Sequence, residues 1–170
     1  MSKYFLIIED RENQYNQIKD VFDGEDGFTN VVGNYSEINE FKEVLQVNQP
    51  QNNYEPINER IGEMLSKVKG DFVLLCDLNL YSAKSESQKM QQGINILRDL
   101  FLPQIDLTLN AYSSKIIVCT KYEEELIEPH FVKLNKQFSD KNITFEYVQK
   151  KFELSLLHED FIEDLKNLIT

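Results

Sequence analysis

Five short segments rich in apolar residues alternate with longer segments in which apolar residues recur every three or four positions. The five segments are residues 4–8, 30–32, 72–76, 116–119 and 143–148. A short, largely apolar run predicts a strand that is covered on both faces, which is typical of a parallel sheet. Strands that alternate with helices predict an α/β fold with helices on both faces of that sheet.

The helices are predicted from apolar stripes and from residues that start or stop a helix. Ser36 is predicted to cap the second helix, and Gly24 and Gly70 to stop the first and third. Pro129 is predicted to break or restart an acidic helix that begins near Glu123. Residues 47–55 and 82–92 are polar without a helical period, which predicts loops. The stripes are Tyr15, Ile18, Val21 and Phe22; Ile38, Phe41 and Leu45; Ile57, Ile61, Met64, Leu65 and Val68; Ile94, Leu97, Leu100 and Phe101; and Leu157, Phe161, Leu165 and Leu168.

Polar residues follow most of the predicted strands. Right-handed crossovers would place the carboxyl ends of all five strands at one edge of the sheet. If the strand order is 2-1-3-4-5, the first and third strands flank the crevice where open α/β sheets bind ligands. The residues at these ends are the candidates for function, and they are Glu9, Asp10, Asp77, Thr120 and Lys150.

Composition narrows the classes of function. The 170 residues are enough for one domain, and the net charge of −11 argues against nucleic acid as the main partner. No apolar run approaches the length of a membrane helix, and the N-terminus does not resemble a signal peptide. Cys76 and Cys119 lie inside apolar runs, so we expect buried free thiols in a reducing cytoplasm.

The three carboxyl groups at the strand ends predict a cation site. Glu9, Asp10 and Asp77 would repel one another unless a cation neutralised them, and Mg²⁺ is a hard cation that prefers oxygen ligands. Lys150 adds a positive charge and Thr120 a hydroxyl group at the same edge. This set suits the transfer of a phosphoryl group to a carboxylate, because the metal ion and the lysine offset the developing oxygen charge.

Ordinary structural roles are alternatives for each of these residues. Asp77 can be a residue at which a strand leaves the core, and Glu9 and Asp10 can favour a helix N-terminus. Thr120 can cap the next helix. Lys150, followed by Lys151, can be one of a solvated pair at the surface.

Four short motifs resemble those of response-regulator receiver domains. Residues 7–10 (IIED) resemble the acidic motif after the first strand, and residues 75–79 (LCDLN) the phosphoacceptor motif. Residues 117–120 (IVCT) resemble the switch hydroxyl motif, and residues 147–152 (YVQKKF) the final lysine motif. The resemblance implies a flavodoxin-like, doubly wound, five-stranded parallel sheet in the order 2-1-3-4-5.

The resemblance also implies a role for each residue. Asp77 would be the phosphoacceptor, and Asp10, Asp77 and the main-chain carbonyl of Asn79 would bind Mg²⁺, with Glu9 holding a metal-bound water. Thr120 and Lys150 would contact the phosphoryl group. The remaining switch residue, Tyr147, would reorient on activation.

The chain departs from the receiver pattern in length and in the residues that flank its motifs. Tyr81 and Lys151 stand where receivers usually carry proline, and Lys121 stands in place of a small residue. Residues 1–170 are expected to form a single receiver-like domain, with insertions at about 47–69, 82–92 and 103–113 and no output domain.

The resemblance predicts a cytoplasmic phosphorelay receiver that is phosphorylated on Asp77 with Mg²⁺ and then switches a protein contact. Its partners would be a histidine kinase or phosphotransfer protein, and a downstream protein or a second copy of the chain, with no nucleic acid and no membrane. Enzymatic activity would be limited to self-phosphorylation and autodephosphorylation. Two alternatives stay open: a degenerate pseudo-receiver that acts without phosphorylation, and a Mg²⁺-dependent phosphohydrolase.

Overall fold

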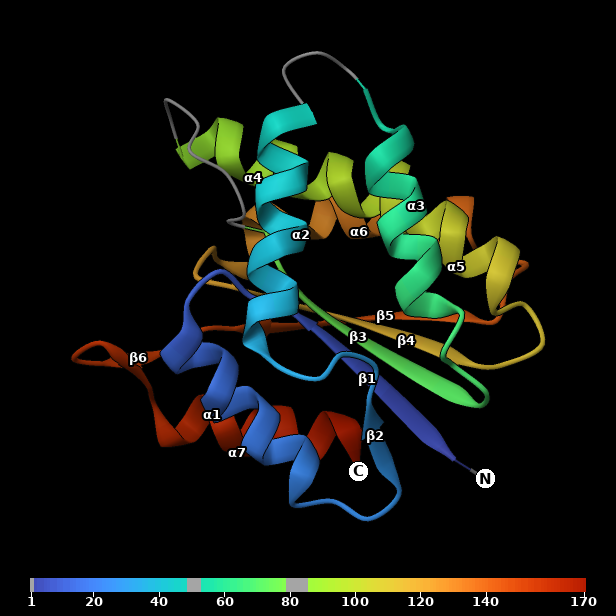
Figure 1. Cartoon of the computed structure of the whole chain (residues 1–170). Helices are drawn as coiled ribbons and strands as arrows, with labels where there is room; N and C mark the ends of the chain where they lie inside the picture. The colour runs from blue at the N-terminus through green and yellow to red at the C-terminus, as the bar shows by residue number, and fades with distance from the viewer. Residues whose placement is uncertain (1, 49–52, 79–85) are drawn as a thin grey trace.

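A five-stranded parallel sheet forms the centre of the molecule (Figure 1). The structure is a computed structural model, and it describes residues 2–48, 53–78 and 86–170. The strand order is β2-β1-β3-β4-β5. The predicted α/β class, the parallel sheet and the strand order are therefore confirmed. The strands are β1 (Lys3–Ile8), β2 (Phe28–Asn30), β3 (Asp71–Asp77), β4 (Ser114–Thr120) and β5 (Ile143–Gln149).

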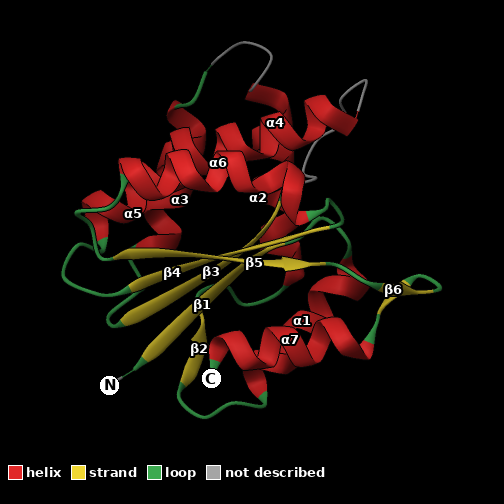
Figure 2. Cartoon of the chain, turned by 180° about the vertical axis from the view of Figure 1, so that it is seen from behind, coloured by secondary structure: helices red, strands yellow, loops and turns green. Residues whose placement is uncertain are grey.

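Helices cover both faces of the sheet, as Figures 1 and 2 show from opposite sides. Helices α1 (Glu12–Asp23) and α7 (Glu159–Ile169) lie on one face and pack against each other. The other face carries α2 (Tyr35–Asn48), α3 (Glu55–Leu65), α4 (Glu86–Ile96), α5 (Leu102–Thr108) and α6 (Glu124–Gln137). Since both faces are covered, the central strands β3 and β4 are buried and apolar, as their sequences predict.

The predicted starts and stops of the first helices are correct for α1 and wrong for α2. Helix α1 ends at Asp23, and the Gly24 amide donates to the Asp20 carbonyl at 3.1 Å. Helix α2 begins one residue before Ser36, whose amide donates to the Asn34 side chain at 3.0 Å. Asn34, the residue directly before α2, therefore takes the capping role that we predicted for Ser36.

The second strand and two of the predicted loops also differ from the structure. Strand β2 ends at Asn30, so the predicted strand at 30–32 begins too late. The predicted loop at 47–55 is wrong at its start because α2 continues to Asn48. Residues 82–85 lie outside the described residues, but 86–92 belong to α4 and are not a loop. Polar sequence hid this helix, whose apolar residues come mainly at its end.

The predicted helix at residues 94–101 is part of a longer helical stretch. Helix α4 continues into a π-helical segment at Leu97–Phe101, and α5 follows without a break. The π-helical segment contains three buried residues, Leu97, Leu100 and Phe101. Each insertion proposed at 47–69, 82–92 and 103–113 thus contributes helical residues to the face that α2–α6 cover.

Two further predictions near the C-terminus are corrected. Helix α6 runs through Pro129 without a break, because buried Ile127 and Leu134 hold the helix on both sides of the proline. Leu157 lies before the closing helix, on a short hairpin made of β6 (Phe152–Glu153) and β7 (Leu156–Leu157). Its two-residue strands are too short to produce an alternating pattern in the sequence.

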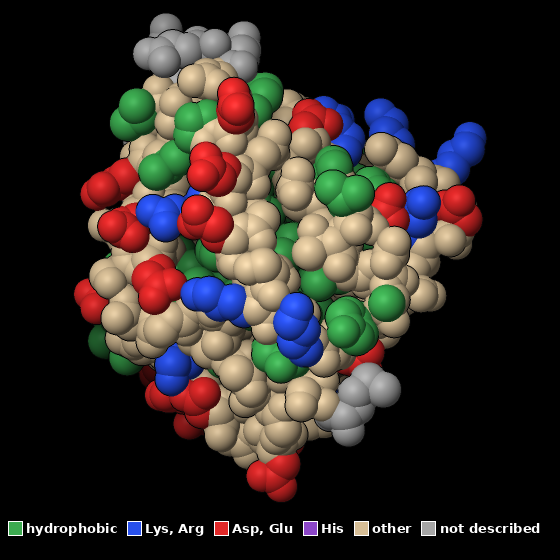
Figure 3. Space-filling view, turned by 45° about the vertical axis from the view of Figure 1, so that its right-hand side comes forward, with side chains coloured by type: hydrophobic (Ala, Val, Ile, Leu, Met, Phe, Trp, Pro, Cys, Tyr) green, Lys and Arg blue, Asp and Glu red, His purple; other side chains and the backbone are tan. Residues whose placement is uncertain are grey.

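The buried apolar side chains of the described residues form one connected core that includes both faces of the sheet. Among the described helices, none is long and apolar enough to cross a membrane. Acidic side chains are spread over the face that Figure 3 presents, with Lys and Arg side chains between them. The many acidic side chains on this face agree with the net charge of −11.

Candidate functional site

The site lies where β1 and β3 end side by side. Glu9 follows β1 directly, and Asp77 is the last residue of β3. Ile8 pairs with Cys76 in the sheet, so the next residue of each strand meets the other at the carboxyl edge. One carboxylate oxygen from each of Glu9, Asp10 and Asp77 lies within 4.8 Å of the others. The predicted carboxylate cluster is therefore present in the structure.

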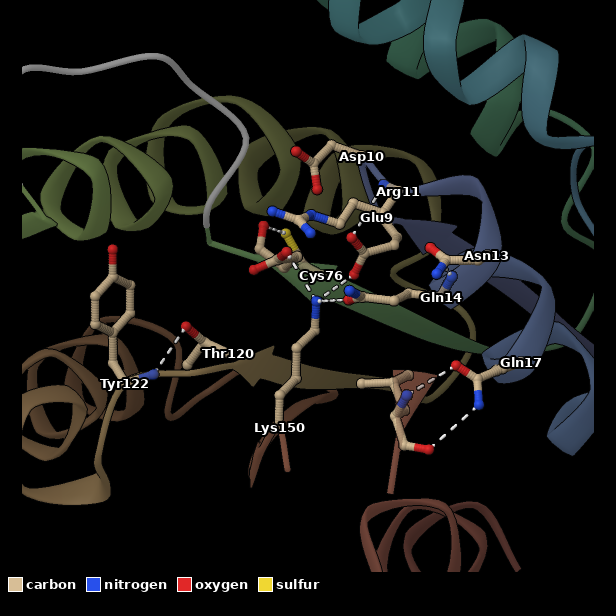
Figure 4. A network of polar contacts seen from close by, with 12 residues as sticks. Glu9, Asp10, Arg11, Asn13, Gln14, Gln17, Cys76, Thr120, Tyr122 and Lys150 are labelled. Carbon is tan, nitrogen blue, oxygen red and sulfur yellow. Dashed lines mark hydrogen bonds and ion pairs between the residues drawn. The ribbon is translucent and has the colours of Figure 1, made fainter. Parts of the chain in front are cut away.

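Lys150 crosses this edge from the end of β5 (Figure 4). Its Nζ donates to Glu9 Oε2 at 2.5 Å, to Gln14 Oε1 at 2.8 Å and to Asp77 Oδ2 at 3.0 Å. Glu9 is 0% exposed, Asp77 is 4% exposed, and the lysine is buried with them. A solvated surface role for Lys150 is thus excluded, because its three ammonium protons have three buried acceptors.

Gln14 is a member of this network that sequence reasoning missed. It lies on the buried side of α1, next to Tyr15. A glutamine within an amphipathic helix carries no distinctive signal, because its side chain is usually solvated. Its burial beside Tyr15, seen only in the folded chain, is accounted for by its hydrogen bond from Lys150.

The turn between β1 and α1 is held from two sides. The Arg11 amide donates to Glu9 Oε1 at 3.2 Å, and the Tyr35 hydroxyl donates to the Asp10 carbonyl oxygen at 2.5 Å. These bonds leave the half-buried Asp10 side chain on the same edge as Glu9. The two acidic residues therefore have different settings, one enclosed and one open to ligands.

Burial and neighbouring charges shift the pKa values of Glu9 and Lys150. Burial, together with the charge of Asp77, raises the pKa of Glu9 to about 8, although Lys150 works in the opposite direction. Burial works to lower the pKa of Lys150, but the charges of Asp77 and Glu9 outweigh it and the pKa is raised. The lysine is therefore a permanent cation among acidic groups, and Glu9 binds a proton at a higher pH than an ordinary glutamate does.

Thr120 and Tyr147 lie beyond the cluster, on the adjoining strands. Thr120 is buried, and its hydroxyl accepts from the Tyr122 amide at 3.4 Å. The Tyr147 hydroxyl donates to the Tyr122 carbonyl oxygen. Helix α6 begins at Glu124, so Thr120 stabilises the turn before the helix and does not cap the helix itself.

A cavity of about 300 Å³ opens beside the cluster. Polar and charged side chains at the ends of β1, β3, β4 and β5 and at the start of α1 line it, together with residues of the β6-β7 hairpin. The lining residues are Asp10, Arg11, Gln14, Asp77, Lys121, Lys150, Phe152, Leu154 and Ser155. A ligand that enters this cavity thus meets Asp10 and Asp77.

Two further predictions concern Asn79 and the cysteines. Asn79, expected to supply a metal ligand, lies outside the described residues. Cys76 and Cys119 are buried free thiols, as predicted, on the adjacent strands β3 and β4. Burial raises the pKa of both thiols, so they stay protonated and unreactive.

Comparison with known proteins gives no family. No protein-family model matches the chain, and no curated protein matches it. The solved structures that match include ADP-ribosyl cyclases. One, complexed with N1-cIDPR, is 10% identical at a TM-score of 0.43, and the match covers 99% of this chain and 67% of the cyclase. A mutant of ADP-ribosyl cyclase is 12% identical at a TM-score of 0.46, covering 87% and 62%. Aplysia cyclase, complexed with substrate NGD and product cGDPR, is 10% identical at 0.39, covering 87% and 62%.

The assignment to the receiver family is therefore wrong: these three solved structures are cyclases, and neither a family model nor a curated protein points to a receiver. The predicted phosphorelay function is therefore also wrong, and the pseudo-receiver and phosphohydrolase alternatives are not supported either. The physical reason is that parallel sheets bring polar strand ends to one edge in many unrelated proteins, so such residues mark a place and not a family. The cyclase likeness, at TM-scores below 0.5, supplies no activity for this chain.

Proposed function

We propose that the chain binds a divalent cation, Mg²⁺, through Glu9, Asp10 and Asp77, and that the bound ion recruits a small oxyanion such as phosphate. The observation that carries the proposal is the cluster itself, in which three carboxylate oxygens from two adjacent strand ends lie within 4.8 Å of one another. Two of the three residues are buried, where like charges repel strongly and a cation relieves them most.

The chemistry of the ligands favours a hard cation. The cluster offers carboxylate oxygens, which suit Mg²⁺ and Ca²⁺ better than the ions that prefer nitrogen or sulfur. Cys76 is close by, but its thiol donates to the Asp77 carbonyl oxygen at 3.5 Å, and its raised pKa keeps it protonated. A protonated thiol is not a metal ligand. Because Mg²⁺ retains waters and binds phosphate oxygens, it fits a cluster that opens into a cavity.

Lys150 gives the site its second positive charge. With the ion in place, Asp10 and Asp77 face a divalent cation as well as the ammonium group, so the edge changes from acidic to anion-binding. Arg11 and Lys121, which line the same cavity, extend this positive field toward its opening. An oxyanion would therefore bind more tightly with the ion than without it.

We infer a flavodoxin-like, doubly wound sheet, which is supported by the strand order and by helices on both faces. In such sheets ligands bind at the strand ends where the order reverses. Here that position is between β1 and β3, where the carboxylate cluster lies.

The test compares Mg²⁺ binding to wild type and to Asp10→Asn by calorimetry. Asp10 is half-buried and its side chain is hydrogen-bonded to Glu9, so its substitution removes a ligand charge while Lys150 keeps its contacts with Glu9 and Asp77. We expect an affinity loss of about tenfold, which corresponds to ~1.4 kcal/mol. Asp20→Asn, an exposed acidic residue on α1, is the matched control and should bind as wild type does. Equal affinities in all three proteins would contradict the proposed site.

A further inference from the structure

The cavity beside the carboxylate cluster has two chemically different sides. Asp10, Asp77 and Lys150 lie on one side, whereas Phe152 and Leu154 of the hairpin lie on the other. We propose that the cavity binds a phosphate ester whose organic part is a flat apolar group, an inference that rests on the proposed metal site. The phosphate would meet the metal ion and Lys150, and the flat group would pack against Phe152 and Leu154.

Alternation along the backbone places these residues together. Successive side chains of an extended chain point to opposite sides, so residues 150 and 152 share one side, and Leu154 follows in the turn of the hairpin. All three line the cavity, and neither Lys151 nor Glu153 does. The apolar wall therefore continues directly from the lysine that contacts Glu9 and Asp77.

The hairpin is attached to the helix that follows the acidic pair. The side chain of Asn13 donates to the Ser155 carbonyl oxygen at 3.2 Å. Gln17 makes two bonds to Leu157, accepting from its amide at 2.9 Å and donating to its carbonyl oxygen at 3.3 Å. Figure 2 shows the hairpin projecting beyond α1 and α7 at the end of β5. These bonds hold the apolar wall in place relative to the carboxylates.

Leu154 is an unfavourable residue for its position in two respects, its exposure to solvent and its backbone conformation. It is 97% exposed, and its φ of 58° lies in the left-handed region that favours glycine or asparagine. The loop between β6 and β7 has two residues, and such loops usually carry Asn, Asp or Gly. Because a leucine here has costs both in solvation and in backbone conformation, its presence indicates a contact that folding alone does not require.

The charges and the size of the cavity define the rest of the ligand. Arg11, Lys121 and Lys150 line a cavity in a protein whose net charge is −11. They balance the nearby carboxyl groups, so the metal ion would leave an excess of positive charge that favours an anion. A volume of about 300 Å³ is at the lower end for small-molecule sites, which suits a phosphate with a single ring.

The test measures the affinities of phenyl phosphate, glycerol phosphate and inorganic phosphate in the presence of Mg²⁺. We expect phenyl phosphate to bind about tenfold more tightly than the other two, because only its ring can contact the apolar wall. Phe152→Ser should lower the affinity for phenyl phosphate to that for glycerol phosphate. Leu156→Ser is the matched control: Leu156 is 49% exposed against 44% for Phe152, on the same hairpin, but it does not line the cavity.

A second variant separates ligand contact from folding. Leu154→Asn suits the left-handed backbone better than leucine does, so it should raise the melting temperature while it lowers the affinity for phenyl phosphate. The inference is overturned if Mg²⁺ and phosphate bind but phenyl phosphate binds no more tightly than glycerol phosphate. It is also overturned if Leu156→Ser lowers the affinity for phenyl phosphate as much as Phe152→Ser does. Absence of Mg²⁺ binding in wild type overturns this inference and the proposed function together.

Discussion

Glu9 and Lys150 are the two residues whose positions decide the chemistry of the site. Both are charged residues at the ends of apolar runs, which is why the sequence identifies them as candidates. The residues that complete the network were harder to predict. Gln14 contacts Lys150 from a helix, and Tyr35 holds the carbonyl oxygen of Asp10 from another helix. Such contacts depend on how helices pack on the sheet, and no local pattern encodes them.

The raised pKa of Glu9 makes stability depend on pH. The folded pKa is about 8 and the ordinary value is 4.5, so the folded state holds a proton that the unfolded chain has released. The free energy of unfolding is therefore highest below pH 4.5 and declines as the pH rises to about 8. Glu9→Gln cannot titrate, so we expect a decline that is smaller by on the order of 2 kcal/mol.

Urea unfolding without divalent cations, at about pH 5 and about pH 8, measures this difference. Glu12→Gln, an exposed residue in the first turn of α1, is the control and should keep the wild-type slope. If Glu9→Gln loses as much stability between the two pH values as wild type does, the burial of Glu9 is not the cause of the decline.

At the scale of elements, the sequence predicts the strands better than the segments between them. Strands β1, β3 and β4 are marked by uninterrupted apolar runs, because burial on both faces leaves no room for polar residues. Most of helix α4 and the whole of the β6-β7 hairpin were missed. A helix with a mostly polar sequence and a hairpin with two-residue strands have too few apolar residues to show their period.

Gly93 shows how α4 affects the site. A Cβ at this position would lie 2.2 Å from the Leu78 carbonyl oxygen, and Leu78 directly follows Asp77. We expect Gly93→Ala to force these backbones apart, to lower the free energy of unfolding by about 1–3 kcal/mol and to weaken Mg²⁺ binding. Chemical denaturation and calorimetry measure the two effects.

Gly62→Ala on α3 is the control for Gly93→Ala. A Cβ there would meet its nearest neighbour, the Gln104 side chain, at 3.9 Å, which is ordinary contact. Alanine should therefore stabilise this helix by about 0.5–1 kcal/mol and leave Mg²⁺ binding as it is. Two glycine substitutions that shift stability in the same direction would contradict the close approach of α4 to Leu78.

Pro129 tests whether packing holds α6 together. The proline lacks the amide that would donate to the Glu125 carbonyl oxygen, yet the helix is continuous from Glu124 to Gln137. Pro129→Ala should restore this hydrogen bond and raise the free energy of unfolding by about 1–3 kcal/mol. Glu128→Ala, at the neighbouring exposed position, should change it far less. A less stable Pro129→Ala variant would mean that the proline has a structural role that packing does not explain.

At the scale of the whole molecule, the sequence predicts the architecture but not the family. Alternating strands and helices fix a parallel sheet and bring the strand ends together, and the structure agrees. The four motifs that suggested a receiver describe the same strand ends, so they repeat what the fold already implies. A place where ligands bind is thus predictable from the pattern, whereas the ligand depends on side chains that only the folded chain assembles.

The net charge of −11 should act on cation binding from a distance. A strongly acidic surface raises the local concentration of Mg²⁺, and salt screens this effect within about 10 Å at 0.1 M. We expect the affinity for Mg²⁺ to fall roughly threefold to tenfold between about 20 mM and about 200 mM KCl. Calorimetry at the two salt concentrations measures this change. An affinity independent of salt would mean that only the cluster itself attracts the ion.

The most direct test of the metal site is a crystal soaked with Mn²⁺, which occupies oxygen sites as Mg²⁺ does and gives an anomalous signal. The account predicts one strong anomalous peak at the carboxyl ends of β1 and β3, in contact with Glu9, Asp10 and Asp77. The same soak of Asp77→Asn crystals should give a much weaker peak there. A wild-type crystal without a peak at this edge, in which Lys150 still contacts Glu9 and Asp77, would contradict the central claim.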